Sequence, residues 1–134
     1  MIFILVSRIC LADIAVVRRM KSPFLLAVEL IGLGLVIWCI CWPLIWRKVP
    51  MNRFYGVRIP ESFVSDQRWY DINAYGGRLM MRWSLLIMLT GLAGFFLPLQ
   101  LFSAYGYIAI AVVLISLLVP LVQIFRWAKA TRQI

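Results

Sequence analysis

Three long runs of apolar residues dominate the chain, at about residues 23–46, 79–99 and 104–127. At 1.5 Å per residue the first run makes a helix of about 36 Å, which exceeds the roughly 30 Å hydrocarbon core of a bilayer. Polar and turn-forming residues fill the connection 47–78, whereas only a few residues separate the second run from the third. The pattern predicts an all-α integral membrane protein with three transmembrane helices, the last two forming an antiparallel hairpin.

The first 22 residues follow a less regular pattern. Arg8 and Asp13 interrupt their apolar stretch, and the segment lacks the basic start and the small-residue cleavage site of a signal peptide. We therefore expect residues 1–22 to form an N-terminal extension that is interfacial or loosely ordered. A fourth spanning helix here stays open as an alternative.

The composition agrees with a membrane protein. Of the 134 residues, 64% are hydrophobic and 14% are charged, against about 25% charged residues in soluble domains. The net charge is +9, from 14 Lys and Arg and 5 Asp and Glu. A soluble protein this basic would suggest nucleic acid, but here the basic residues flank the apolar runs. We expect contact with anionic lipid headgroups and no direct binding of nucleic acid.

The distribution of Lys and Arg predicts the orientation of the helices. Seven Lys and Arg residues lie between residues 47 and 82, three lie after residue 125, and four lie near the N-terminus. With three membrane crossings, the first two groups share one side of the membrane, which gives ten basic residues there against four on the other side. The positive-inside rule then places the loop 47–78 and the basic tail 128–134 in the cytoplasm, with the N-terminus outside. The aromatic residues agree, since four Trp lie at the predicted cytoplasmic boundary: Trp42, Trp46, Trp83 and Trp127.

Small and polar residues are expected at the contacts between helices, because lipid tails are as apolar as Leu. Spacings of three and four residues predict one such seam on each helix, although chance alignment would give the same pattern. The predicted seams are Glu29, Gly32, Val36 and Pro43; Ser84, Ile87, Gly91, Gly94 and Pro98; and Gly106, Ala109, Val113, Ser116, Pro120 and Gln123.

Glu29 is the one acidic residue inside a predicted span. A carboxylate at that depth is costly, so it is protonated, paired or in a wet cleft, as a ligand or proton site would be. The alternative is that Glu29 lies within about 9 Å of the outer boundary and reaches headgroups. Glu29 and Gln123 are the two candidate polar residues within the membrane.

The connection 47–78 carries further candidates. Ser65 followed by Asp66 is typical of a helix start and predicts a short helix over residues 66–75. On it Trp69 and Asn73 are four residues apart and lie side by side. We expect this helix at the membrane interface, with Trp69 and Ile72 inserted and with a turn into the second span at Gly76 and Gly77.

Three motifs of this loop, in their order, resemble the signature of the SdpI-like family: Pro50-x-Asn52, Gly56-x-Arg58 and Trp69-x-x-x-Asn73 followed by Gly77. One position departs, because the family usually has Thr where this chain has Ile59. The resemblance implies a bacterial inner-membrane immunity protein that protects against a toxin or antimicrobial peptide. In the family's prototype the protein also recruits a transcriptional repressor to the membrane.

The loop residues have two interpretations from their chemistry. Asn52, Arg58 and Asn73 either clamp a backbone or phosphate oxygen of a partner, or tie the loop together beneath the helices. The six loop candidates for partner binding or loop structure are Asn52, Gly56, Arg58, Trp69, Asn73 and Gly77.

The sequence offers little for catalysis. It has no His, the acidic residues form no intramembrane pair, and Cys39 and Cys41 face different ways on a helix. We expect no enzymatic activity, no catalytic residues, no metal and no cofactor. An accessory subunit or solute conduit of a transport complex, with Glu29 and Gln123 lining a polar path, is the alternative function. Oligomerisation is left open.

Overall fold

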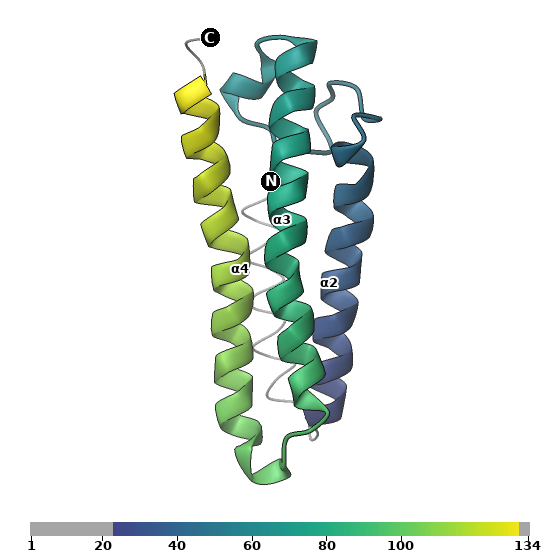
Figure 1. Cartoon of the computed structure of the whole chain (residues 1–134), viewed down its shortest axis with the longest axis vertical. Coiled ribbons are helices and arrows are strands. Elements are labelled where there is room, and N and C mark those ends of the chain that lie inside the picture. Colours follow the sequence, from purple (N-terminus) through teal and green to yellow (C-terminus); the bar gives the residue numbers. More distant parts are fainter. Residues whose placement is uncertain (1–22, 132–134) are drawn as a thin grey trace.

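The computed structural model describes residues 23–131. Its long helices are α2 (Pro23–Ile45), α3 (Asp66–Gly94) and α4 (Phe102–Ala130), and two 3-10 turns, η1 (Pro60–Phe63) and η2 (Leu99–Leu101), lie in the connections. The long helices alternate in direction and form one elongated bundle (Figure 1). The predicted N-terminal extension 1–22 and residues 132–134 of the basic tail lie outside the described residues.

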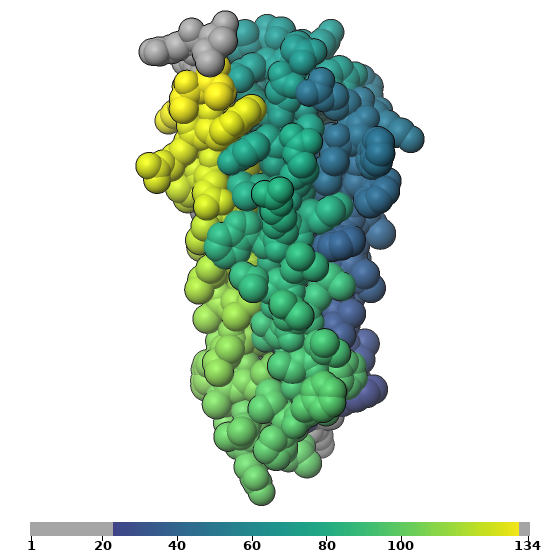
Figure 2. Space-filling model, in the orientation of Figure 1, coloured from purple at the N-terminus to yellow at the C-terminus, as the bar shows by residue number. Residues whose placement is uncertain are grey.

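The helix α3 is the centre of the bundle. It contacts both α2 and α4, whereas α2 and α4 touch each other sparsely, and the space-filling view shows α3 packed between them (Figure 2). Two clusters of buried residues hold the helices together. One lies toward the α3–α4 connection and contains Leu26, Leu30, Ile87, Tyr105, Ala109 and Val113. The other lies under the loop and contains Ile59, Ile72, Ile124 and Ala128.

The predicted seams of the last two helices are largely confirmed. Ser84, Ile87, Gly91 and Gly94 of α3 are buried, and so are the first five predicted seam residues of α4. Gly91 shows why small residues are needed, because a Cβ there would lie 2.8 Å from the carbonyl oxygen of Ala27 in α2. Two members were wrong: Pro98 lies beyond the end of α3 and Gln123 is exposed, its place in the seam being taken by Ile124.

The predicted seam of α2 was wrong. Glu29 is exposed, Val36 is 53% exposed, and a Cβ on Gly32 would meet nothing within 4 Å. The buried side of α2 consists of Pro23, Leu26, Ala27, Leu30, Gly34, Cys41 and Leu44. Small residues do lie at the contact, but they are Ala27, Gly34 and Cys41 rather than the predicted Gly32, and a Cβ on Gly34 would overlap the side chain of Met88 in α3.

The short interfacial helix was also wrong as a separate element. Its predicted start is right, since the side chain of Ser65 accepts a hydrogen bond from the backbone N–H of Arg68. The helix then continues without a turn to Gly94 as the single helix α3. Trp69 and Ile72 are fully buried against protein rather than inserted in lipid. Gly76 and Gly77 lie inside this continuous helix and form no turn. Their missing side chains instead leave room for neighbouring segments to approach α3.

Two stretches have the length and hydropathy to cross a membrane among the described residues, α2 and Leu99–Ala130. The helix α3 is long enough, but its first half carries charged and polar side chains that lower its hydropathy. Residues 23–131 are therefore all-helical, with three long helices, of which two have the composition of a membrane span.

Candidate functional site

The loop after α2 is fastened to α3 through Asn73. The side-chain oxygen of Asn73 accepts a hydrogen bond of 2.6 Å from the backbone N–H of Val57, and its amide group donates to the carbonyl of Trp69 at 2.9 Å. Asn73 is only 1% exposed. Gly56 lies directly over it with φ +111°, a conformation that favours glycine, and a Cβ at Gly56 would overlap the Asn73 oxygen. Gly56 and Asn73 therefore form one fitted contact.

Trp69 and Asn52 order the rest of the loop. The indole N–H of Trp69 donates to the carbonyl of Val49 at 2.9 Å, and its ring packs on Phe63 with 5.4 Å between centroids. The side-chain oxygen of Asn52 accepts from the backbone N–H groups of Phe54 and Tyr55, each at 2.8 Å. Such an Asx turn lets a short polar side chain replace missing backbone bonds. Both residues structure the loop.

The loop also reaches back onto α2. The hydroxyl of Tyr55 donates a hydrogen bond to the carbonyl of Ile40. Burial raises the pKa of Tyr55 above its ordinary value, so the phenol remains a donor at neutral pH. At the same level Gly77 of α3 approaches α2, where a Cβ would lie 3.3 Å from the carbonyl of Cys41. Gly77 therefore serves the packing of α2 on α3.

Arg58 does not join Asn52 and Asn73 in a clamp. Its guanidinium donates to the carbonyl of Arg53 and so closes the segment between the two residues. The Nε–H of Arg58 is buried without a hydrogen-bond partner among the described residues. The three residues do not bond one another: each amide makes its own local bonds and Arg58 bonds within the loop, as expected if they tie the loop together. A clamp on an oxygen of a partner stays a prediction.

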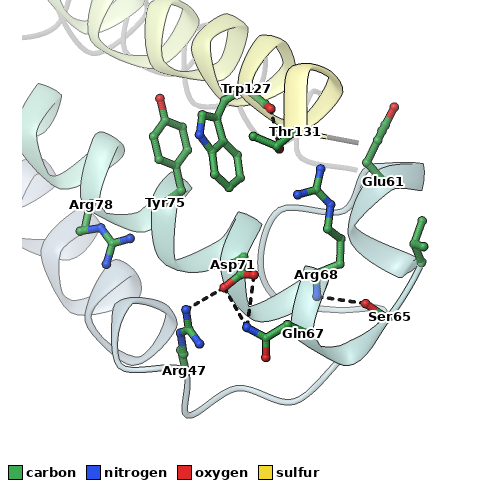
Figure 3. A pocket seen from close by; sticks show the side chains of 11 residues that line it. Arg47, Glu61, Ser65, Gln67, Arg68, Asp71, Tyr75, Arg78, Trp127 and Thr131 are labelled. Carbon is green, nitrogen blue, oxygen red and sulfur yellow. Dashed lines mark hydrogen bonds and ion pairs between the residues drawn. The ribbon is translucent and has the colours of Figure 1, made fainter. Parts of the chain in front are cut away.

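A pocket lies beside the loop, at the end of the bundle where α2 ends and α3 begins (Figure 3). Its volume is about 750 Å³. Side chains from the end of α2, from η1, from α3 and from the end of α4 line it. The lining residues are Arg47, Glu61, Val64, Ser65, Gln67, Arg68, Asp71, Tyr75, Arg78, Trp127 and Thr131.

An ion pair forms one side of this pocket. Arg47 donates to the carboxylate of Asp71 at 2.6 Å, and the side-chain amide of Gln67 lies 3.3 Å from the same carboxylate. Arg47 has φ 55°, a left-handed conformation that is uncommon outside glycine. It stands directly after α2, in the position where helices usually have glycine. An arginine at such a position brings its charge to Asp71 at a cost in backbone energy.

Aromatic rings form the opposite side. Tyr75 and Trp127 stack with 4.4 Å between their centroids and an interplanar angle of 12°. The guanidinium of Arg68 lies 5.7 Å from the centroid of the Trp127 ring and donates to the carbonyl of Ala128 at 2.6 Å. These contacts join the end of α4 to the start of α3, so the pocket exists only when the bundle is assembled.

Sequence reasoning missed this pocket, although a signal was present. Arg68, Asp71, Tyr75 and Arg78 follow one another at spacings of three, four and three residues. That spacing places them on one stripe of a continuous helix. The signal was lost because the sequence was divided into a loop helix and a span at Gly76.

The two intramembrane candidates do not meet. Glu29 is near the start of α2 and Gln123 near the end of α4, which are opposite ends of the bundle (Figure 1). Both side chains are exposed on the outside of the bundle. A polar path lined by both residues is therefore not formed.

Comparison with known proteins identifies the family. The sequence profile of the SdpI/YfhL protein family matches residues 48–123. The chain belongs to this family. The matched region contains all six loop candidates together with α3 and most of α4, and it leaves out α2 and Glu29. No curated relative and no solved structure matches the chain.

The position at which the chain departs from the resemblance, Ile59, has a clear structural role. Ile59 is 5% exposed and belongs to the cluster of Ile72, Ile124 and Ala128. Its backbone N–H bonds the hydroxyl of Ser62 at 3.2 Å, and that hydroxyl donates to the Ile59 carbonyl at 2.8 Å. In this chain the position anchors the loop by apolar burial.

Proposed function

We propose that this SdpI/YfhL family protein is a membrane immunity protein that protects a bacterium against an antimicrobial peptide or toxin, and that it signals by binding a cytoplasmic partner such as a repressor. The observation that carries the proposal is the family match over residues 48–123, which covers the ordered loop and the helices below it. The protein acts by binding and has no catalytic step of its own.

The proposed topology has three crossings of the bacterial inner membrane. The loop 47–65 and the end of α4 lie at one end of the bundle (Figure 1), and the excess of Lys and Arg at that end favours the cytoplasm. Reporter fusions within the loop and after Ala130 are expected to report the same, inner side. An external signal from either fusion contradicts the orientation.

The partner surface is the outer side of the loop. Asn52, Trp69 and Asn73 hold the segment in one conformation, which lowers the entropy lost when a partner binds. The tip of this segment presents Phe54, which is 85% exposed, beside the basic residues Arg53 and Arg58. An exposed aromatic ring next to arginines is the composition of many binding hot spots.

The test is protection of a sensitive host by the Arg58→Lys variant. Lysine keeps the charge but loses the planar group of donors that reaches the Arg53 carbonyl. We expect protection to fall while the amount of protein in the membrane stays normal. Arg126→Lys is the matched control, because Arg126 is an exposed arginine near the same end of the bundle and lies outside the loop. Equal protection by wild type and both variants would refute a specific role for the loop.

A further inference from the structure

The pocket beside the loop is not explained by the proposed partner surface. Its lining combines three arginines with two acids. Asp71 is already neutralised by Arg47 in the 2.6 Å ion pair. Arg68 donates to a neutral carbonyl, and Arg78 has no hydrogen bond or ion pair with any described residue. The lining therefore carries two guanidinium charges, those of Arg68 and Arg78, against one remaining carboxylate, that of Glu61.

The charged groups are arranged along the axis of α3. Arg68 and Arg78 are ten residues apart, which is about 15 Å along a helix. Arg68 lies near the start of α3, and Arg78 lies farther along it toward the middle of the bundle. In the proposed topology Arg78 is thus the group nearer the lipid and Arg68 the group nearer the cytoplasm.

The pocket also offers acceptors between its two ends. The carboxylates of Asp71 and Glu61 accept hydrogen bonds, and the stacked rings of Tyr75 and Trp127 close the side toward α4 (Figure 3). A ligand that fits has a negative group for Arg78 and neutral hydroxyl donors for the carboxylates. A second full negative charge placed next to Asp71 or Glu61 would be repelled by that carboxylate, whereas a hydroxyl there can donate to it.

We propose that this pocket binds one anionic phospholipid of the surrounding leaflet through a phosphate with a polyol headgroup, the chemistry of phosphatidylglycerol. The phosphate is held by Arg78, and the glycerol hydroxyls reach Asp71, the nearer of the two carboxylates on the same side of the pocket (Figure 3). Basic pockets between membrane helices at the cytoplasmic side are known to bind anionic lipid headgroups. The inference rests on the proposed topology and not on protection against a toxin.

The experiment measures lipid retention by the purified full-length protein. Protein is reconstituted in phosphatidylcholine nanodiscs that contain a minor fraction of phosphatidylglycerol, and bound lipid is counted by native mass spectrometry. Arg78→Gln is expected to weaken retention of phosphatidylglycerol about tenfold relative to Arg126→Gln, the loss of one charged hydrogen-bond pair. Arg126 is the matched control, since it is exposed near the same end of the bundle and lies outside the pocket.

Two controls keep the result interpretable. Arg78 is exposed and unpartnered among the described residues, so Arg78→Gln is expected to melt at the wild-type temperature in pure phosphatidylcholine. Inorganic phosphate, added to the same nanodiscs, tests for a soluble ligand. The proposal is overturned if Arg78→Gln and Arg126→Gln retain equal lipid, or if inorganic phosphate displaces phosphatidylglycerol from the wild type. If wild-type protein retains phosphatidylglycerol normally but does not protect a sensitive host, that result counts against the proposed immunity function and not against the lipid site.

Discussion

The fitted contact between Gly56 and Asn73 gives the sharpest test of the loop. Replacing Gly56 by Ala places a Cβ on a residue with φ +111° and against the Asn73 oxygen. The backbone term is about 1–2 kcal/mol for an L-residue in this region. Asn73 is 1% exposed and cannot turn to solvent, so moving its oxygen breaks the 2.6 Å bond from Val57 and leaves a buried amide unpaired.

A lost bond of that kind is worth about 1–3 kcal/mol. Together the two effects lower the free energy of unfolding by about 3 kcal/mol, or roughly 10 °C in the melting temperature of a chain of this size. The assay is thermal melting in detergent, followed by size exclusion, with limited proteolysis of the loop at a fixed temperature. We expect Gly56→Ala to melt early and to be cut in the loop.

The matched control is Gly32→Ala in α2. Nothing lies within 4 Å of a Cβ at Gly32, and alanine in a helix is about 1 kcal/mol more favourable than glycine. Gly32→Ala is therefore expected to leave the melting temperature unchanged or to raise it. Equal melting temperatures and equal proteolysis of the two variants would refute the structural role assigned to Gly56.

Three further predictions concern single contacts. The ion pair of Arg47 with Asp71 is exposed and worth less than about 1 kcal/mol. Glycine adopts φ 55° without strain, so the Arg47→Gly variant should melt no lower than wild type. The Arg47→Ala variant loses the same ion pair and keeps the strain, so it should melt at a lower temperature than Arg47→Gly. Burial raises the pKa of the Tyr55 phenol above its ordinary value of 10.0. The neutral phenol of Tyr55 therefore stabilises the fold fully below about pH 10, and this stabilisation declines as the pH rises further. When melting temperature is measured against pH, Tyr55→Phe should lack this part of the decline. Gly91→Ala places a Cβ 2.8 Å from a backbone oxygen of α2 and should lower the melting temperature, while the Gly32→Ala control does not.

The parts of the fold that could be predicted were those with a local cause. Apolar runs longer than a bilayer predict long helices, and the cap at Ser65 predicts where α3 begins. The seams of α3 and α4 could also be predicted, since small residues such as Gly91 and Gly94 permit a close approach of helices. At the start of α3, the four-residue spacing of Trp69 and Asn73 correctly indicated that the two side chains are neighbours.

The parts that could not be predicted depend on partners distant in sequence. The buried side of α2 is set by which of its residues reach α3, so Glu29, which is exposed, was wrongly assigned to the contact. The pocket needs the end of α4 over the start of α3, where Trp127 meets Tyr75 and Arg68. No local pattern in residues 66–75 contains that information. Arg47 likewise shows its role only when Asp71 is beside it.

The continuity of α3 changes how a signal would cross this molecule. Two adjacent glycines inside a helix cost about 1 kcal/mol each relative to alanine, and that cost is offset only where the missing Cβ atoms allow contact. Gly76 faces Val57 and Ile124, whereas Gly77 faces Ile45 and the Cys41 carbonyl. At this level of the bundle, the loop and α4 therefore contact one side of α3, and α2 contacts the other side. A hinge at this point would break both contacts together. If the proposed partner binds the loop, we expect α3 to shift as one rigid helix, which would move its seams with α2 and α4 together.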